Sequence, residues 1–184
     1  MKTLLTLICL AVSALSLTGP LHAQEPKMLT AYFSWSGNTR SIAQQIHQKV
    51  GGDLVEIEPV RPYSRDYNTC LDEAQRDQAN QARPELRTRI DNIADYDVIF
   101  LGYPNWWATI PMPVATFLEQ YDLRGKTIVP FASHGGGRLG QSVSDIAKLS
   151  PQSTILEALS VSYGGGSSLS RDIDAWLEKN SLKK

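Results

Sequence analysis

The sequence predicts an α/β fold in which one doubly wound parallel β-sheet carries helices on both faces. Apolar runs of strand length alternate along the chain with segments whose apolar residues have helical spacing. The runs cover residues 28–33, 54–57, 98–101, 127–132 and 154–161. This alternation is typical of parallel sheets, because each helix returns the chain to the edge where the next strand begins. Loops rich in Ser, Gly or aromatic residues follow three of the runs, at the edge where open α/β sheets bind ligands.

The segments between the runs predict which helix faces are buried. Their apolar stripes are Ile42, Ile46 and Val50, then Val114, Phe117, Leu118 and Tyr121, and finally Ile173, Trp176 and Leu177. Residues 64–90 are expected to hold an exposed crossover helix between two loops, with Tyr67, Leu71 and Ala74 as its thin apolar face. Pro130 cannot donate a ladder hydrogen bond, so either its nitrogen faces a gap in the sheet or the strand bends there.

The N-terminus has the three-part form of a secretory signal peptide. A basic residue precedes the apolar stretch 4–17, and Leu21-His22-Ala23 ends in the small residue that closes such a segment. A buried first helix or a membrane anchor is the alternative, but a bilayer span needs about 20 apolar residues. We therefore expect residues 1–23 to be removed and residues 24–184 to form one domain. That domain would be periplasmic or secreted, with no stable membrane insertion.

Composition excludes several classes of partner. The chain has 18 Lys and Arg against 19 Asp and Glu, a net charge of −1. This balance gives no basis for binding nucleic acid or an anionic membrane surface. Cys9 lies in the predicted signal peptide, so Cys70 would be the sole thiol of the folded domain and no internal disulfide is expected.

A loop with many hydrogen-bond donors, Ser34-Trp35-Ser36-Gly37-Asn38-Thr39, joins the first run to the first helical stripe. Its backbone amides and the positive end of the helix converge where an anion would bind. A simple helix cap is the plainer interpretation, but here hydroxyls and amides crowd a short segment. The triphosphate pattern G-x-x-x-x-G-K-[ST] and the dinucleotide pattern G-x-G-x-x-G are both missing from this turn. The loop therefore suits a monophosphate ester held by neutral donors.

An aromatic loop follows the third run. Tyr103, Trp106 and Trp107 flank Pro104 and Asn105, and rings at the ligand edge of a sheet favour stacking. One tryptophan is expected to anchor the following helix and at least one to stack on a ligand, and the sequence does not distinguish the two.

A third loop, Ser133-His134-Gly135-Gly136-Gly137-Arg138, follows the fourth run. Its small side chains would let a planar ring lie against the backbone, with amide donors reaching the polar edge of a flavin. His134 would either contact that ring or face solvent. The loop 34–39, which we call the phosphate cradle, and the two loops suited to a planar ring lie at one sheet edge. Together they indicate flavin mononucleotide, FMN.

Together the three loops resemble the flavodoxin-like family. Its members share a strand ending in Y-F-S-x-[ST]-G-N-T, a G-Y-P-x-W-W loop and a late H-G-G segment, matched by residues 32–40, 96–117 and 125–142. The resemblance implies a five-stranded sheet of order 2-1-3-4-5. It also implies that Ser34, Ser36, Gly37, Asn38 and Thr39 bind the phosphate, that Tyr103 to Trp107 flank the isoalloxazine, and that Ser133 to Gly137 face its polar edge. Ala108 departs from the glycine that many relatives carry there, and alanine adopts a positive φ less readily.

The expected function is electron transfer through FMN by an exported protein, acting on a redox partner protein or a small quinone-like acceptor. No side chain is assigned a catalytic role and no metal site is expected, because the flavin supplies the chemistry. The alternatives are an FMN-dependent quinone or NAD(P)H reductase and a ligand-free, non-catalytic exported module. A serine hydrolase is disfavoured, because residues 140–144 lack the last glycine of the G-x-S-x-G elbow.

Overall fold

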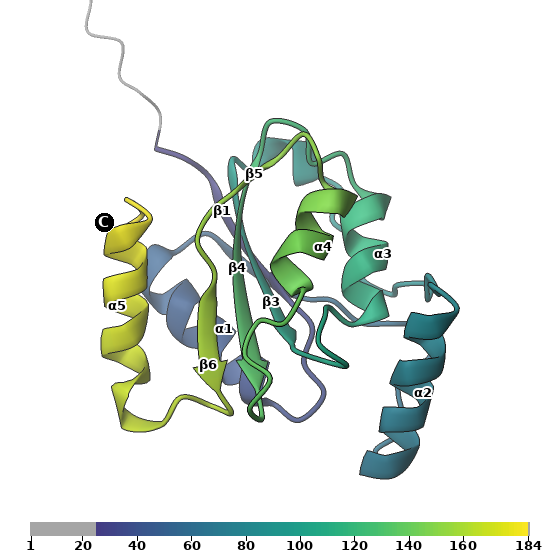
Figure 1. Cartoon of the computed structure of the whole chain (residues 1–184). Helices are drawn as coiled ribbons and strands as arrows, with labels where there is room; N and C mark the ends of the chain where they lie inside the picture. Colours follow the sequence, from purple (N-terminus) through teal and green to yellow (C-terminus); the bar gives the residue numbers. More distant parts are fainter. Residues whose placement is uncertain (1–24, 184) are drawn as a thin grey trace, which may run out of the picture.

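The computed structural model describes residues 25–183, so the predicted signal peptide lies outside the described residues. Figure 1 shows one twisted sheet between two groups of helices. The strands are β1 (Met28–Tyr32), β2 (Asp53–Glu56), β3 (Val98–Pro104), β4 (Thr127–His134), β5 (Thr154–Ile155) and β6 (Leu159–Ser162). The helices are α1 (Asn38–Val50), α2 (Tyr67–Ala79), α3 (Met112–Gln120), α4 (Ser142–Leu149) and α5 (Leu169–Lys179), with 3-10 helices η1 (Ile93–Asp95) and η2 (Gly166–Ser168).

All strand pairs are parallel, in the order β2-β1-β3-β4-β5, and β6 also pairs with β4. The predicted order 2-1-3-4-5 is therefore confirmed, with β5 and β6 sharing the fifth position. Because the pairing is parallel throughout, the carboxyl ends of β1, β3, β4 and β6 lie at one edge, which the arrowheads mark in Figure 1.

The fifth run forms two strands rather than one, and Pro130 explains the division. β5 pairs with Thr127 and Ile128, whereas β6 pairs with residues 131–134. Ile128 accepts a hydrogen bond from the amide of Leu156 at 2.9 Å, and residues two apart direct their peptide groups to the same neighbouring strand. The nitrogen of Pro130 therefore faces the interval between β5 and β6. The sequence left open a gap in the ladder or a bend in the strand, and the structure has the gap.

Two apolar layers, one on each face of the sheet, bury the predicted helical stripes. α1 and α5 cover one face, and α3 and α4 cover the other (Figure 1). The buried residues include Ile42, Ile46, Val50, Ile173, Trp176 and Leu177 in the first layer, and Val114, Phe117, Leu118 and Ile146 in the second. Tyr121 lies just past the end of α3, where its ring packs on Phe117 with 5.2 Å between centroids.

The exposed crossover helix is α2, but its buried face differs from the predicted one. Cys70 and Ala74 are buried, whereas Tyr67 is 62% exposed. Asp66 caps the helix by accepting from the amide of Thr69 at 2.9 Å, which fixes the helix start. α2 packs against α3 at the periphery of the molecule (Figure 1), so it needs only small side chains on its inner face. Tyr67 is free to face the loops at the sheet edge instead.

Both central strands continue beyond the apolar runs. β3 extends to Pro104 and β4 to His134, with Tyr103 opposite Ala132 and Pro104 opposite Ser133. Five residues expected in loops, namely Gly102, Tyr103, Pro104, Ser133 and His134, therefore belong to strands, because the β3–β4 ladder continues past the apolar runs.

Replacing Gly102 with alanine should destabilise the fold. A Cβ there would lie 2.2 Å from Cζ of Phe131 and 2.9 Å from Cβ of Tyr32. Since both neighbours are buried strand residues, we expect the free energy of unfolding in urea to fall by about 2 kcal/mol or more. The double variant Gly102→Ala/Phe131→Leu should lose less than the sum of its two single changes, because the shorter side chain relieves the overlap. Wild-type stability of Gly102→Ala would contradict this packing.

Candidate functional site

The three predicted loops meet at the carboxyl edge of the sheet and are hydrogen-bonded to one another. The Oγ1 of Thr39 lies 2.8 Å from the Oγ of Ser133, joining the loop after β1 to the end of β4. The amide of Asn105 donates to the carbonyl of Ser133 at 2.8 Å. Its side-chain Nδ2 donates to the carbonyls of Gly137 at 3.1 Å and Arg138 at 2.6 Å. The edge is therefore one connected surface.

The loop after β1 folds around the hydroxyl of Ser34. Its Oγ accepts from the amides of Gly37 and Arg40, each at 3.2 Å, and Gly37 has a φ of 92°. A Cβ on Gly37 would meet no atom within 4 Å, so the space outside the loop is open. The amides of Asn38 and Thr39 stand in the first turn of α1, where a helix offers no acceptor. With the helix dipole, these amides favour an anion by roughly 0.3–1 kcal/mol.

Thr39 and Ser133 take a positioning role that the sequence does not reveal. Both are buried, with 1% and 4% exposure, and their hydroxyls pair with each other. Binding of a phosphate by the Thr39 hydroxyl stays a prediction, and within the protein this hydroxyl contacts Ser133. Ser36 remains exposed in the same loop, and the side chains of Ser34 and Asn38 are partly exposed.

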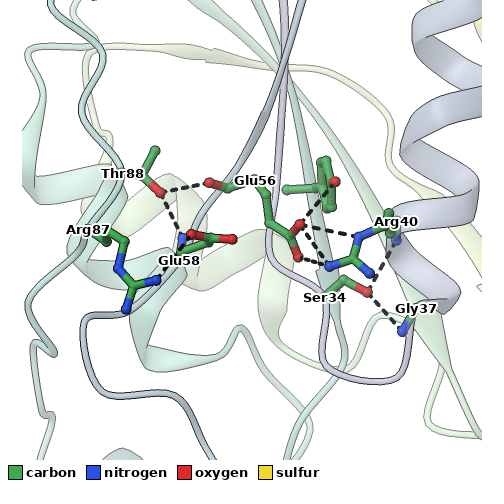
Figure 2. Close-up of polar contacts among 8 residues, drawn as sticks. Ser34, Gly37, Arg40, Glu56, Glu58, Arg87 and Thr88 are labelled. Atoms are coloured by element: carbon green, nitrogen blue, oxygen red, sulfur yellow. Dashed lines mark hydrogen bonds and ion pairs between the residues drawn. The ribbon is translucent and has the colours of Figure 1, made fainter.

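Arg40 points away from the loop, toward β2. Its guanidinium forms a bidentate pair with the carboxylate of Glu56, with the closest contact at 2.6 Å (Figure 2). The Tyr32 hydroxyl donates to the same carboxylate at 3.3 Å. Hydrogen bonds to Glu56 raise the pKa of Arg40 further. The loop of residues 34–39 therefore offers neutral hydrogen-bond donors, and the charge of Arg40 is paired with Glu56. Beside this loop lies a hollow of about 500 Å³, lined in part by Ser34, Ser36 and Arg40.

The aromatic loop separates into buried and exposed rings. Tyr103 is fully buried in β3, and its hydroxyl donates to Ser142 at 2.9 Å. Burial raises the pKa of Tyr103 to about 12. Its ring belongs to the core and not to the ligand edge. Pro104 ends β3 beside it.

The structure distinguishes the two tryptophans. Trp106 packs edge-on against Phe33 and Tyr63, with centroids 5.3 and 5.1 Å away, so it anchors the loop. Trp107 is 44% exposed, and its Nε1 donates to the carbonyl of Leu71 on α2 at 3.1 Å.

Trp35 also faces the α2 side of the edge. Its Nε1 donates to the carbonyl of Ser64 at 2.8 Å, and its ring lies 6.1 Å from that of Tyr67. Trp35 and Trp107 thus contact two positions near the start of α2, Tyr67 and Leu71. The helix forms one rim of the ligand edge.

The glycine loop, residues 133–138, presents backbone rather than side chains. His134 Nδ1 accepts from the amide of Gly136 at 3.0 Å, which fixes a neutral imidazole. Burial and the nearby Arg138 lower the pKa of His134. A Cβ on Gly136, whose φ is 132°, would meet nothing within 4 Å. On either side of it, a Cβ on Gly135 would lie 3.6 Å from the Tyr163 hydroxyl, and one on Gly137 would lie 3.2 Å from Nδ2 of Asn105.

Asn105 carries a buried side-chain oxygen that accepts no hydrogen bond within the described residues. Its Oδ1 is buried and has no hydrogen-bond partner within residues 25–183, although its Nδ2 and its amide are both bonded. A buried acceptor of this kind is costly unless a ligand donor reaches it.

A fourth loop, which was not predicted, lies at the same edge. Residues 163–165 follow β6, and Tyr163 is 63% exposed. Its amide donates to the carbonyl of His134 at 2.8 Å. The sequence does contain a signal for this loop. Ser-Tyr-Gly-Gly-Gly follows the last apolar run, just as loops rich in Ser, Gly or aromatic residues follow three of the earlier runs.

Two classes of feature are absent from the described residues. Between residues 25 and 183, no cluster of three or more His, Cys, Asp and Glu side chains could hold a metal ion. Over the same range, no helix is long and apolar enough to cross a membrane.

The turn at Ala108 is strained, so glycine there should stabilise the protein. Trp106 and Thr109 exchange two backbone hydrogen bonds of 3.0 Å around Trp107 and Ala108, whose φ values are 48° and 65°. This is the type I′ geometry, in which glycine is preferred. Ala108→Gly should raise the free energy of unfolding by about 1 kcal/mol in urea denaturation. Ala115→Gly, in the interior of α3, should lower it by about as much. An equal decrease in the free energy of unfolding in both variants would contradict strain at Ala108.

Comparisons with known proteins agree with this architecture. The model of the flavodoxin family matches residues 27–180. A candidate flavoprotein from Bacteroides eggerthii is 35% identical with a TM-score of 0.73, over 83% of this chain and 96% of that one. Another from Bacteroides uniformis is 28% identical with a TM-score of 0.75, over 84% and 99% of the two chains.

A flavoprotein from Lactobacillus acidophilus, solved in complex with FMN, shares the fold. It is 24% identical with a TM-score of 0.65, over 82% of this chain and 98% of that one. No curated protein sequence matches the chain. The family match spans nearly all of the described residues and includes every loop of the candidate site. The chain belongs to the flavodoxin family.

Proposed function

We propose that this protein binds FMN at the carboxyl edge of its sheet and transfers electrons through it. The observation that carries the proposal is the loop at the start of α1. There Gly37 leaves open space, the first-turn amides lack acceptors within the helix, and Arg40 is paired with Glu56. A phosphate monoester suits such a site. Membership of the flavodoxin family and the FMN complex of a related fold support the same ligand.

The residues present suit each part of FMN. Ser34, Ser36, Gly37 and Asn38 would hold the phosphate. Trp107 and the peptide strip of residues 135–137 would contact the isoalloxazine, with Trp35 at the rim. The unpartnered Oδ1 of Asn105 supports this fit, because the isoalloxazine carries an N–H donor.

Bound FMN supplies one- and two-electron redox chemistry, and the chain supplies orientation and access. Thr39 and Ser133 fix the spacing between the phosphate loop and the glycine loop. His134 presents a neutral imidazole to this edge, since its Nδ1 accepts from Gly136 and burial lowers its pKa. No side chain of the site needs to transfer a proton.

Export of the protein belongs to the same proposal. Residues 1–23 have the form of a secretory signal, and the family match starts after them, at residue 27. The mature protein would act in the periplasm or outside the cell, with a redox partner protein or a small quinone-like acceptor.

A negative charge placed in the cradle should weaken FMN binding selectively. Ser36 is exposed in the loop, so Ser36→Asp puts a carboxylate beside the phosphate. We expect the Kd for FMN to rise about tenfold or more by calorimetry, while the Kd for riboflavin, which lacks the phosphate, changes little. Ser36→Asn is the matched control, because asparagine has the size of aspartate but no charge. If wild-type protein takes up no FMN, the ligand-free module replaces this proposal.

Kinetics separate a carrier from a self-sufficient reductase. As a carrier, the FMN-loaded protein should oxidise free NADPH or NADH slowly, well below the 1–10³ s⁻¹ typical of enzymes. Chemically reduced protein should nevertheless pass electrons rapidly to a small quinone or to cytochrome c. The measurement is anaerobic stopped-flow absorbance of the flavin. Rapid reduction by either nicotinamide nucleotide would favour the reductase.

A further inference from the structure

Arg40 stands where its charge would reach the phosphate cradle. It lies in the first turn of α1, and its amide donates to the Oγ of Ser34 at 3.2 Å. Side chains of an α-helix lean toward the helix N-terminus, so the side chain of Arg40 starts toward the end of α1 where the cradle lies. A guanidinium at that end would give a phosphate a charge-assisted hydrogen bond. Position along the helix alone therefore predicts a cationic cradle.

Glu56 draws the guanidinium toward β2 instead. Its carboxylate accepts from Nη2 of Arg40 at 2.6 and 2.8 Å and from Nε at 3.2 Å (Figure 2). The side chain of Glu56 is 21% exposed, against 47% for the side chain of Arg40. The carboxylate is therefore the more enclosed partner of the pair.

The surroundings of Glu56 fix this carboxylate in place. Glu56 ends β2 in register with Tyr32 of β1, whose hydroxyl donates to the carboxylate at 3.3 Å. The Oγ1 of Thr88 donates to the carbonyl of Glu56 at 2.7 Å, and the amide of Ile57 donates to the carbonyl of Tyr32 at 2.6 Å. Because the carboxylate is held by the sheet, it determines where the guanidinium of Arg40 lies.

Stability of the fold does not account for this pair, because ion pairs with an exposed partner contribute little to the free energy of unfolding. The same hollow holds a second such pair, in which Arg87 lies 3.9 Å from Glu58. In the described part of the chain, neither of these two residues is hydrogen-bonded to the cradle. The pair of Arg40 and Glu56 differs because Arg40 belongs to the hydrogen-bond network around Ser34.

We propose that Glu56 is a positioning residue that holds Arg40 away from the cradle and so limits how strongly the protein binds the phosphate of FMN. The inference rests on the proposed FMN function and deepens it, because it names a residue on which the phosphate affinity depends. With Glu56 present, directed neutral donors select the phosphate. Without its charge, the guanidinium turns toward the end of α1, and binding becomes both tighter and dependent on salt.

The test is calorimetric titration of the protein with FMN and with riboflavin, which lacks the phosphate. Glu56→Gln keeps the size of the side chain and removes its charge. The Kd for FMN should fall about fivefold, while the Kd for riboflavin stays within about twofold of wild type. Raising NaCl from about 50 mM to about 500 mM should remove most of this gain, because salt screens the new ion pair. The Kd of wild-type protein for FMN should depend less on salt.

Two further variants separate the movement of Arg40 from the lost charge of Glu56. The double variant Arg40→Gln/Glu56→Gln should bind FMN within about twofold of wild type, because no cation remains to turn toward the cradle. Glu58→Gln is the matched control, since it removes the carboxylate of the second pair in the same hollow. It should leave the ratio of the two Kd values unchanged.

Three results would overturn the role of Glu56 and leave the FMN function standing. They are an unchanged ratio of Kd values in Glu56→Gln, an equal gain in the double variant, and weaker binding of both ligands, which would mean that Glu56 only supports the loop. If wild-type protein binds neither FMN nor riboflavin, the FMN function fails, and this inference fails with it.

Discussion

The parallel ladder of β1, β3 and β4 determines where the three predicted loops lie. It brings the ends of three strands to one edge, so loops separated by about a hundred residues meet there. The buried pair of hydroxyls on Thr39 and Ser133 then fixes the distance between the first and third loops. A buried hydroxyl without a partner is costly, so this contact holds the two loops in register.

Backbone strain is concentrated at this same edge. Four non-glycine residues with positive φ, namely Trp107, Ala108, Arg138 and Tyr163, all lie in loops that follow β3, β4 or β6. A sheet and two helical layers with well-packed cores can tolerate several such residues. Because strain of this kind raises the free energy of the folded protein, its clustering at the proposed ligand edge supports a functional origin. The remaining two such residues, Gln81 and Ser181, follow helices, where this conformation commonly ends a helix.

Peptide groups and aromatic rings are the parts of this sheet edge that a ligand would contact. The charged side chains lie around the edge. Arg40 is neutralised by Glu56, and the pair lies outside the cradle (Figure 2). Farther along the same side, Arg87 lies 3.9 Å from Glu58, which again pairs a cation with a carboxylate. Selection of a flavin phosphate would therefore depend on directed hydrogen bonds and the helix dipole, which salt screens less than it screens exposed ion pairs.

Local patterns in the sequence were enough to predict the sheet and the three loops. Apolar runs alternate with helical stripes along the chain, and loops at strand ends must gather at one edge of a parallel sheet. The contacts of each side chain at that edge depend on the tertiary structure instead. The sequence could not show that Tyr103 enters the core, that Thr39 pairs with Ser133, or that Tyr163 lies beside Gly135, because each depends on contacts between strands distant in the chain. The spacing of apolar residues in the sequence predicts where a residue lies along a strand. The residue that its side chain contacts depends on how the strands and helices pack.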